Sequence, residues 1–319
     1  MGKRSKKSNR AVNGWLAVDK PSGMGSTDVV NRLKRLLDAP KVGHGGTLDP
    51  MATGVLPIAF GEATKTMNYA LNGNKGYLAT VQWGTSTTSL DADGQIELSG
   101  GLIPDANQIE AALPAFIGEI SQVPPKVSAL KVDGKRAHQL VREGEEFELE
   151  PRQTKIFELR LESHDPVAGR SEIFVSAAKG FYVRALARDL ATSLGTLAHL
   201  VALRRVRSGP FGVEQCISLE KLEAMDHISD REALLLPLKR ALDDIPALEL
   251  GEAAARQLRN GQSVWVLRRS LLDQIDAKLP GFLSSQSEPV SVLVTAEGAE
   301  VGLAEFARGR VSPKRLFNI

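Results

Sequence analysis

A single carboxylate in a glycine-rich stretch is the side chain best placed to do chemistry. Asp49 lies within Gly43-His44-Gly45-Gly46-Thr47-Leu48-Asp49-Pro50, and four glycines fall within residues 43–54. Glycine lets the backbone reach positive φ and lets another molecule approach closely. Because Pro50 restricts the conformation of the residue before it, the local sequence already limits the direction of the Asp49 side chain. A carboxylate held in this way can act as a nucleophile, although the pattern alone fits a structural turn equally well.

A basic side chain is the second candidate. Leu186, Leu190 and Leu194 recur every four residues and predict an amphipathic helix with Arg184 in its first turn. Since a positive charge at that end opposes the helix dipole, Arg184 is expected to have a specific acidic partner. No second carboxylate is evident in a loop that matches the one around Asp49, and this disfavours a glycoside hydrolase.

The sequence indicates no metal or cofactor site. The five histidines have no ligand spacing, and no Walker lysine pattern occurs. Residues 23–28 approach a dinucleotide fingerprint, but Asp28 stands where the third glycine belongs. The one cysteine, Cys216, excludes an internal disulfide, which favours a reducing compartment, and we expect it to fill space in a core. The chemistry expected of the chain therefore uses neither a metal nor a nucleotide cofactor.

Apolar spacing predicts the elements that must position Asp49 and Arg184. A strand over 14–18 leads into a helix that Ser26 or Thr27 caps, and a buried strand over 55–60 follows the glycine-rich stretch. Asp133-Gly134 predicts the turn of a hairpin. The remaining predictions are helices over 63–71 and 105–116 and strands over 76–84, 154–164, 171–177 and 198–205.

The length of 319 residues allows one large domain and a small second one. An acidic, amphipathic segment over 218–244 ends before a run of short strands, so we place a boundary between residues 246 and 247. Residues 1–12 contain five Lys or Arg and are expected to form a flexible basic arm. The expected organisation is therefore an arm over 1–12, a large domain over 13–246 and a small domain over 247–319.

Positive charge is segregated although the net charge is only +2. Residues 1–65 carry eleven Lys or Arg against five Asp or Glu, and further basic clusters lie at 204–207 and 308–315. A basic face of this kind suits the phosphates of a nucleic acid, and scattered solvated charges are the alternative. No apolar run approaches the roughly 18 residues of a membrane span, and no apolar segment follows the basic arm, so a cytoplasmic protein is expected.

The loop sequence is similar to a known signature. Residues 43–50, together with Ala52-Thr53-Gly54-Val55-Leu56, closely resemble the motif of the tRNA pseudouridine synthase B family. The resemblance implies that the chain isomerises uridine 55 in the T-loop of tRNA to pseudouridine, with Asp49 as the catalytic residue and no cofactor. It also implies an α+β fold with a mixed, largely antiparallel sheet and flanking helices. Residues 247–319 resemble the small PUA-like β-barrel, an RNA-binding domain that ends many members of the family.

Further site residues follow from the same resemblance. The family places its arginine, here Arg184, against the catalytic aspartate, and in a dry pocket two charge-assisted hydrogen bonds from it would keep Asp49 ionised. Tyr77 corresponds to the tyrosine that stacks on the flipped base, Tyr182 to a residue of the active-site wall, and Leu203 to the leucine that lines the uracil pocket. The implied site is a nucleophile, its arginine and a shaped pocket.

Two residues beside these have implied roles, and one segment departs from the family pattern. Lys20, in Lys20-Pro21-Ser22-Gly23, belongs to a second family motif packed near the catalytic loop. His44 is the candidate for filling the space that the flipped base leaves. Relatives usually carry tyrosine where this chain has Val127 and His138, so neither receives a role, and His138 is expected at the surface or in a turn.

The resemblance and the charge distribution agree on the partner. The T-arm of tRNA is the expected ligand of a monomer that contacts no membrane and no nucleotide cofactor. A non-catalytic RNA-binding or tRNA-chaperone module is the rival interpretation. Such a module would have no use for a carboxylate that faces phosphates.

Overall fold

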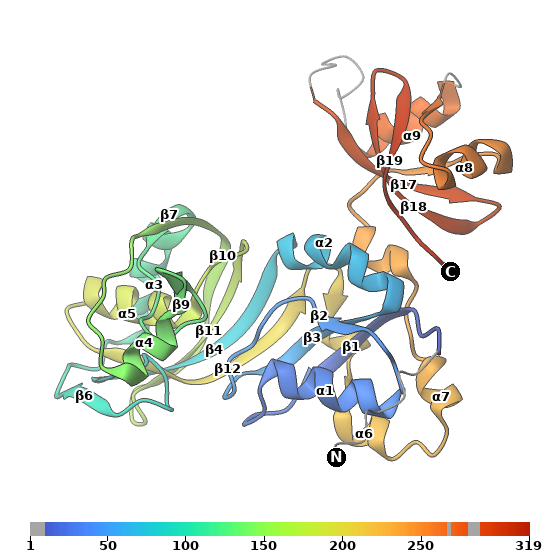
Figure 1. Cartoon of the computed structure of the whole chain (residues 1–319). Coiled ribbons are helices and arrows are strands. Elements are labelled where there is room, and N and C mark those ends of the chain that lie inside the picture. Colours follow the sequence, from blue (N-terminus) through green and yellow to red (C-terminus); the bar gives the residue numbers. More distant parts are fainter. Residues whose placement is uncertain (1–9, 267–268, 280–287) are drawn as a thin grey trace.

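The computed structural model describes residues 10–266, 269–279 and 288–319 (Figure 1). Most of the predicted basic arm therefore lies outside the described residues, and Arg10, near its end, pairs with Glu232 at 2.7 Å. Within the described parts, the strands form one ten-stranded sheet, one five-stranded sheet and two small hairpins. Most pairings are antiparallel and helices flank the large sheet, so the predicted α+β class is confirmed.

Two groups of strands make the large sheet, and β12 joins them. The main path runs through β14 (Ile217–Ser218), β1 (Gly14–Lys20), β3 (Thr53–Phe60), β12 (Ala198–Ser208), β4 (Lys75–Trp83), β11 (Arg170–Ala177), β10 (Arg152–Asp165) and β7 (Gly118–Gln122). β12 forms a long antiparallel ladder with β4, but it pairs in parallel with β3 at Arg204 and Arg205 alone among the described residues. The segment that carries Asp49 enters β3 beside this short pairing.

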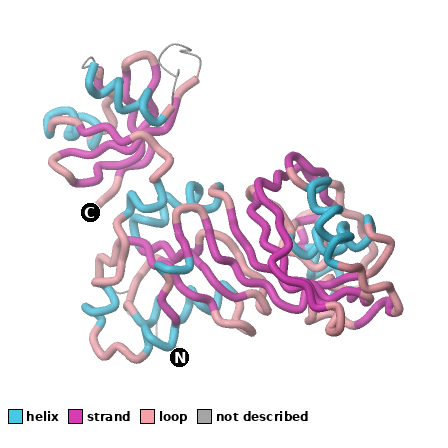
Figure 2. The backbone as a smooth tube through the Cα atoms, turned by 180° about the vertical axis from the view of Figure 1, so that it is seen from behind, coloured by secondary structure: helices cyan, strands magenta, loops and turns pink. Residues whose placement is uncertain are grey.

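Helices cover the two ends of the sheet separately (Figures 1 and 2). Beside β1 and β3 lie α1 (Ser26–Leu36), α6 (Leu219–Glu223) and α7 (Ile228–Glu232). Beside β10 and β11 lie α3 (Ala106–Ala112), α4 (Ala137–Glu143) and α5 (Val183–Ser193). Figure 2, the view from behind, shows the strands running between these two ends without a break. The sheet is therefore the scaffold that brings the loop before β3 close to the start of α5.

Short strands complete the large domain. β2 (Val42–His44) pairs with β3, and β13 (Phe211–Gly212) pairs with β12. One hairpin consists of β5 (Thr85–Thr87) and β6 (Ile96–Ser99), and the other of β8 (Lys131–Val132) and β9 (Lys135–Arg136). The second hairpin turns at Asp133-Gly134, where both residues have positive φ, which confirms the predicted turn.

The predicted cap of α1 is wrong. Neither Ser26 nor Thr27 is the N-cap residue, because Gly25 holds that position and Ser26 is the first residue of the helix. The Ser26 hydroxyl is instead used by the loop, since it donates to the Leu48 carbonyl at 3.0 Å and accepts from the Leu48 N–H at 2.9 Å. Serine often caps helices, but here the hydroxyl of Ser26 binds the main chain of a residue that lies 22 positions away in the sequence.

Two predicted helices are shorter than expected. Residues 63–71 are divided between a 3-10 helix, Gly61–Thr66, and α2 (Met67–Asn72). The helix expected over 105–116 is α3, which starts after a capping box at Asp105 and gives way to a 3-10 turn over Leu113–Phe116. Pro114 lacks the N–H that would continue the α-helical pattern, which explains the change.

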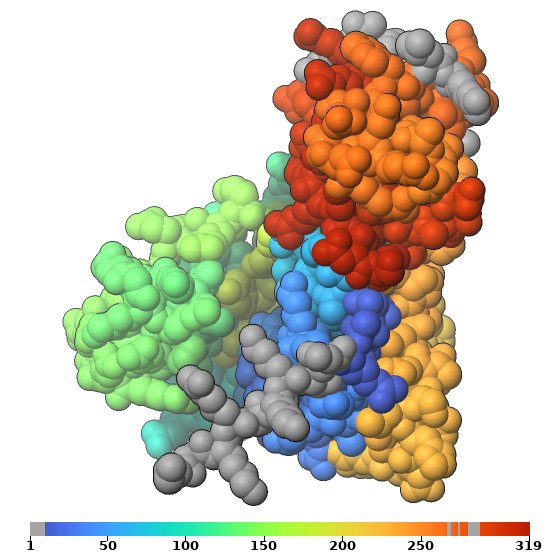
Figure 3. Space-filling model, turned by 45° about the vertical axis from the view of Figure 1, so that its right-hand side comes forward, coloured from blue at the N-terminus to red at the C-terminus, as the bar shows by residue number. Residues whose placement is uncertain are grey.

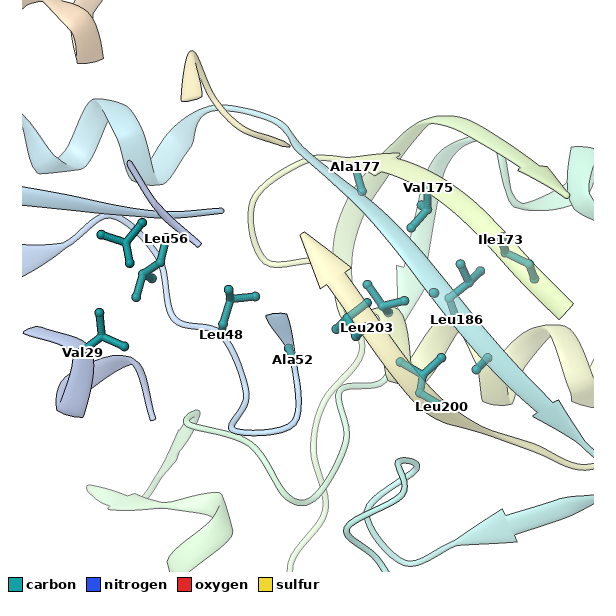
Figure 4. Packing of buried hydrophobic residues seen from close by; sticks show 14 of the residues in the cluster. Val29, Leu48, Ala52, Leu56, Ile173, Val175, Ala177, Leu186, Leu200 and Leu203 are labelled. Carbon is teal, nitrogen blue, oxygen red and sulfur yellow. The ribbon is translucent and has the colours of Figure 1, made fainter. Parts of the chain in front are cut away.

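The apolar core runs beneath the glycine-rich loop. Leu48 is 4% exposed and Ala52 is fully buried, so the main chain is anchored on both sides of Asp49. Figure 4 shows these two side chains between Val29 and Leu56 on one side and Leu203 on the other. The core therefore connects both groups of strands through the loop.

A second sheet begins at Ala247. Its strands, in spatial order, are β15 (Ala247–Glu249), β17 (Val290–Ala296), β18 (Ala299–Ala307), β19 (Arg310–Leu316) and β16 (Val264–Trp265), with α8 (Glu252–Arg259) and α9 (Arg269–Lys278) beside them. Figure 3 shows this part, in orange and red, lying against the blue N-terminal part of the chain. The two parts share an apolar cluster in which Leu293, Leu303 and Phe317 pack together with Trp15 and Phe211.

Candidate active site

Two glycines with positive φ shape the loop that carries Asp49. Gly46 has φ of 126° and Gly54 has φ of 97°. A Cβ added to Gly54 would lie 2.2 Å from the main-chain oxygen of Arg205. Only glycine lets β3 begin this close to β12, so at Gly54 the close approach is made by another strand of the same chain.

Lys20 supports the loop from behind. Its side chain is fully buried, and its ammonium donates to the carbonyls of Pro21, Met24 and Pro50 at 2.6 to 3.0 Å. Burial lowers the pKa of Lys20 to about 8, against the opposing effect of the nearby Asp49 carboxylate. The predicted proximity to the loop is therefore observed. Substrate contact by Lys20 is contradicted by its burial, because no part of the side chain is accessible.

Arg184 connects Asp49 to a second carboxylate. Its Nη2 lies 3.0 Å from Asp49 Oδ2, and its Nη1 lies 3.0 Å from Asp91 Oδ2 and donates to the Ser89 carbonyl at 3.0 Å. The acidic partner that the helix position predicted is thus present. The expectation that both arms of the guanidinium hold Asp49 is wrong, because one arm is taken by Asp91.

Asp91 is one of two site residues that sequence reasoning missed. It lies in the turn after β5, is 4% exposed, and accepts hydrogen bonds from the Ser89 hydroxyl and from the Asp93 N–H. Several carboxylates occur near it in the sequence, so nothing in the local pattern separates it from solvated turn residues. Its burial is a consequence of tertiary packing, since the main chain of Asp91 forms an isolated β-bridge with Leu200 on β12.

The surroundings of Asp49 raise the pKa of its carboxyl group. Desolvation is the largest cause and the Asp91 charge adds to it, while the Arg184 and Lys20 charges oppose it. Arg184 therefore opposes the burial effect in the expected direction, although desolvation prevails and the pKa of Asp49 lies above its ordinary value. The Asp49 side chain is 38% exposed, so its carboxylate remains open to a ligand.

A cavity of about 350 Å³ lies beside this network. Its lining contains five residues that the sequence predicted: Asp49, Tyr77, Tyr182, Arg184 and Leu203. They come from four separate segments, namely the loop, β4, the start of α5 and β12. The fold thus brings together in one place most of the side chains expected at the site.

Tyr182 is held by its main chain. Its N–H donates to the Gln122 side chain at 2.9 Å, and its carbonyl accepts from the same amide group at 3.1 Å. The side-chain amide of Gln122, which is 2% exposed, therefore makes the two hydrogen bonds to the Tyr182 main chain that the backbone of a neighbouring strand would otherwise make. Burial raises the pKa of the Tyr182 phenol, so it stays protonated. Sequence reasoning missed Gln122, because nothing in the sequence near residue 122 points to position 182.

His44 lies on β2, outside the lining of the cavity. It is half-buried, and its Nδ1 has no hydrogen-bond partner among the described residues. Burial and the nearby positive charge of Arg205 lower its pKa, which favours the neutral ring. His138 is not a turn residue, because it lies in the first turn of α4 with its Nδ1 3.0 Å from the carbonyl of Ser128, a residue of the cavity wall.

The basic cluster at 204–207 does not face solvent as a unit. Arg205 is 1% exposed, and Arg204 forms two hydrogen bonds with Asp19 at 2.8 and 3.0 Å. Arg207 is exposed. The expected phosphate-binding role of the whole cluster is therefore wrong for Arg205. A register shift between Arg205 and Arg207 in the β4–β12 ladder interrupts the regular alternation of side chains, so the two arginines differ in exposure.

Comparisons with known proteins give the class and the family. The family model described as TruB family pseudouridylate synthase (N terminal domain) matches residues 34–183, and the model for the tRNA pseudouridylate synthase B C-terminal domain matches residues 184–243. Together with the fold and the carboxylate beside its cavity, these matches define a pseudouridylate synthase. Within this class, the chain belongs to the tRNA pseudouridine synthase B family.

Similar proteins match over nearly their whole length. The tRNA pseudouridine synthase B of Rhodospirillum rubrum is 47% identical, over 97% of this chain and 98% of the relative. The protein of the same name from Caulobacter vibrioides is 43% identical, over 98% of this chain and 99% of the relative. The family resemblance of the loop motif is thereby confirmed for the chain as a whole.

Solved structures share the fold. A chain in the crystal structure of a Cbf5-Nop10-Gar1 complex has a TM-score of 0.69 and 21% identity, over 99% of this chain and 92% of that chain. A chain in the structure of an H/ACA RNP bound to a substrate RNA containing 2'-deoxyuridine has a TM-score of 0.67 and 19% identity. The match covers 99% of this chain and 93% of that chain. At this identity the likeness concerns the fold alone.

Two further features are absent from the part of the chain that the structure describes. No helix among them is long and apolar enough to cross a membrane. No group of three or more His, Cys, Asp or Glu side chains in the same residues could hold a metal ion.

Proposed function

We propose that the chain converts uridine 55 in the T-loop of tRNA to pseudouridine, with Asp49 as the nucleophile. The relatives named tRNA pseudouridine synthase B support the reaction and the class of RNA. One observation carries the assignment to a site: the Asp49 carboxylate, paired with Arg184 at 3.0 Å, lies in the wall of a cavity of about 350 Å³. A cavity of this size can hold a nucleobase with its ribose.

The reaction is an isomerisation that needs no external reagent. The N1–C1′ bond breaks and its electron pair leaves with the uracil; the base then rotates, C5 bonds to C1′, and the proton on C5 is lost while N1 gains one. Asp49 takes part either by attacking C1′ or by removing the C2′ proton to give a glycal. Both routes require an ionised and aimed carboxylate.

Arg184 and Asp91 together orient the Asp49 carboxylate. Arg184 is buried at the start of α5, and Asp91 fixes the arm of its guanidinium that does not reach Asp49. Charge-assisted hydrogen bonds are short and directional, so this arrangement restricts the Asp49 carboxylate to one orientation. The positive charge also opposes the rise in pKa that burial causes.

The other cavity residues would hold the base. We assign Tyr77 to stacking on the uracil, Tyr182 to the wall and Leu203 to an apolar side. The uridine must first leave its stack inside the tRNA, at a cost of a few kcal/mol, and stacking on one aromatic ring returns about 1–3 kcal/mol. His44, a neutral ring just outside the cavity, is the candidate for the space that the base leaves.

The basic surfaces would hold the rest of the tRNA. Exposed cations lie in the cavity wall at Lys179, on β12 at Arg207 and on the second sheet at Lys314 and Arg315. We assign RNA binding to residues 247–319, in the manner of a PUA-like domain, and we expect a monomer to act on the T-arm in the cytoplasm.

The experiment that tests this function compares the wild type with Asp49→Asn on unmodified tRNA. The amide keeps the shape of the carboxylate but cannot act as a nucleophile. We expect tritium release from [5-³H]uridine tRNA by the wild type, none by the variant, and equal tRNA affinity in filter binding. A tRNA with cytidine at position 55 tests the position, because release from it would place the reaction elsewhere. A wild-type protein that binds tRNA without releasing tritium would support the rival RNA-binding or chaperone module.

A further inference from the structure

One buried cation in the wall of the cavity has no part in the reaction described above. Arg205 lies on β12, and 1% of its surface is exposed. Its Nε donates to the Val55 carbonyl at 2.7 Å, its Nη1 to the Thr47 carbonyl at 3.2 Å and its Nη2 to the Gly46 carbonyl at 3.0 Å. Two of these carbonyls precede Asp49 in the chain and one follows it. A single guanidinium therefore ties both sides of the loop that carries the nucleophile.

No carboxylate lies within ion-pair distance of Arg205 among the described residues. Burial lowers the pKa of its guanidinium, and the Tyr77 hydroxyl, directly across the β4–β12 ladder, favours the charged form. A buried cation without an anionic partner is costly to keep in a protein interior. A cation retained at that cost, whose three hydrogen bonds to main-chain carbonyls all go to the residues on either side of Asp49, is most simply explained by what it does to that segment.

We propose that Arg205 is a positioning residue for Asp49, which acts by fixing the main chain at Gly46, Thr47 and Val55. This inference rests on the proposed function, because it concerns the direction of the nucleophile. With so little of its surface accessible, Arg205 offers a substrate almost nothing to touch. Its effect reaches the reaction through the loop, and through Tyr77, which it faces across the strands.

The number and direction of the bonds require arginine. Guanidinium presents five N–H donors in one plane, whereas the lysine ammonium is a compact point charge on a flexible stem. Lysine at position 205 would retain the charge but could not reach carbonyls on both sides of the loop in the same geometry. A displacement of the nucleophile by about 1 Å can lower the rate on the order of a hundredfold.

The chain contains a matched control. Arg231 is 8% exposed and also donates to three main-chain carbonyls, those of Leu36, Leu222 and Met225. These carbonyls belong to the last residue of α1, to α6 and to the segment just after α6, and none of the three residues lines the cavity. Arg231→Lys therefore reproduces the structural loss of Arg205→Lys without affecting the Asp49 loop.

The test measures stability, tRNA affinity and single-turnover rate for wild type, Arg205→Lys and Arg231→Lys. We expect both variants to lose similar thermal stability and to bind tRNA within about twofold of wild type. Arg205→Lys should turn over about a hundredfold more slowly, whereas Arg231→Lys should keep the wild-type rate. Hydrogen exchange in the peptide over 43–57 should accelerate in Arg205→Lys alone. Equal rates for the two variants, or unchanged exchange in this peptide, would overturn the inference.

A second variant covers the case in which Arg205→Lys does not fold. Arg205→Gln brings no charge into the interior and keeps two N–H donors for the three carbonyls, so it should fold where the lysine variant fails. The same separation between rate and affinity is expected, and an Arg205→Gln protein with the wild-type rate contradicts the proposal. If instead the wild type itself forms no pseudouridine, it is the proposed function that fails, and the exchange measurement still tests the loop.

Discussion

Arg184 holds Asp49 with one arm of its guanidinium, Nη2 to Oδ2 at 3.0 Å, while its other arm lies at the same distance from Asp91. The nucleophile is therefore one of three charged groups whose positions depend on each other. Two carboxylates share one guanidinium, so the Asp91 charge raises the pKa of Asp49 while the Arg184 charge lowers it. Changes at either neighbour should alter turnover before they alter RNA binding.

Arg184→Lys should damage turnover far more than its conserved charge suggests. An ammonium cannot span Asp49 and Asp91 in the geometry of the planar guanidinium, so the carboxylate loses its fixed direction. We expect a rate lower on the order of a hundredfold and a tRNA affinity close to wild type. Single-turnover kinetics beside filter binding measure the two effects. Equal losses in rate and affinity would mean that Arg184 contacts RNA.

Asp91→Asn should shift the pH dependence of the reaction. The Asp91 charge raises the pKa of Asp49, so removing it should lower that pKa and move the acidic limb of the pH–rate profile to lower pH. The plateau rate should fall about tenfold, because Arg184 keeps its bond to the Ser89 carbonyl but loses one charged partner. A profile recorded between pH 5 and 8 decides this, and an acidic limb that moves to higher pH contradicts the network.

Tyr77 should contribute mainly through its ring face. Tyr77→Phe retains the aromatic surface and is expected to bind tRNA more tightly than Tyr77→Ala, which loses about 1–3 kcal/mol of stacking. Affinity titrations of both variants with unmodified tRNA make the comparison. Equal losses of affinity in the two variants would rule out stacking as the role of this side chain.

Gly54→Ala should destabilise the protein more than an equivalent change elsewhere. Gly54 and Gly100 both have positive φ, but only Gly54 has an atom near the position of an added Cβ, the Arg205 carbonyl oxygen at 2.2 Å. Gly100→Ala is expected to cost about 1–3 kcal/mol from backbone strain, and Gly54→Ala about 1–3 kcal/mol beyond that from overlap. Urea unfolding of the two variants gives the difference, and similar midpoints would show that β3 can move away from β12.

The affinity for tRNA should depend steeply on salt. If exposed cations such as Lys179, Arg207, Lys314 and Arg315 neutralise phosphates, the logarithm of affinity falls linearly with the logarithm of salt concentration, with a slope of about −0.9 per contact or shallower. Replacing Arg315 with Gln should reduce the slope by about one contact. A slope near zero would contradict recognition of the RNA backbone.

Much of the fold follows from local patterns. The continuous apolar run of β3, the alternation in β4 and the four-residue apolar spacing in α5 are all local patterns, so the sequence predicts these elements well. A glycine-rich loop and a cation at a helix start drew attention to Asp49 and Arg184, but the loop alone fitted a structural turn equally well, and the family resemblance supplied the expected roles. The Asp133-Gly134 turn is a local pattern as well, since few residues tolerate its geometry.

The remaining features depend on contacts between distant segments. Asp91 and Gln122 are polar residues without a local signature, and their roles come from Arg184 and Tyr182, which lie 93 and 60 residues further on. Arg205 was counted with a phosphate-binding cluster, because a run of arginines does not reveal which side of the sheet each one faces. Ser26 has the chemistry of a helix cap, but the Leu48 main chain uses its hydroxyl.

The apolar cluster that joins the two sheets has a consequence for cooperativity. Leu293, Leu303 and Phe317 pack against the residues around Trp15, and Val55, just beyond the Asp49 loop, belongs to the same cluster. Neither sheet can lose its order without exposing part of the interior of the other. Heating should therefore produce a single calorimetric peak, with equal calorimetric and van't Hoff enthalpies. A fragment that ends at residue 246 should melt earlier and self-associate through the face that the second sheet had covered.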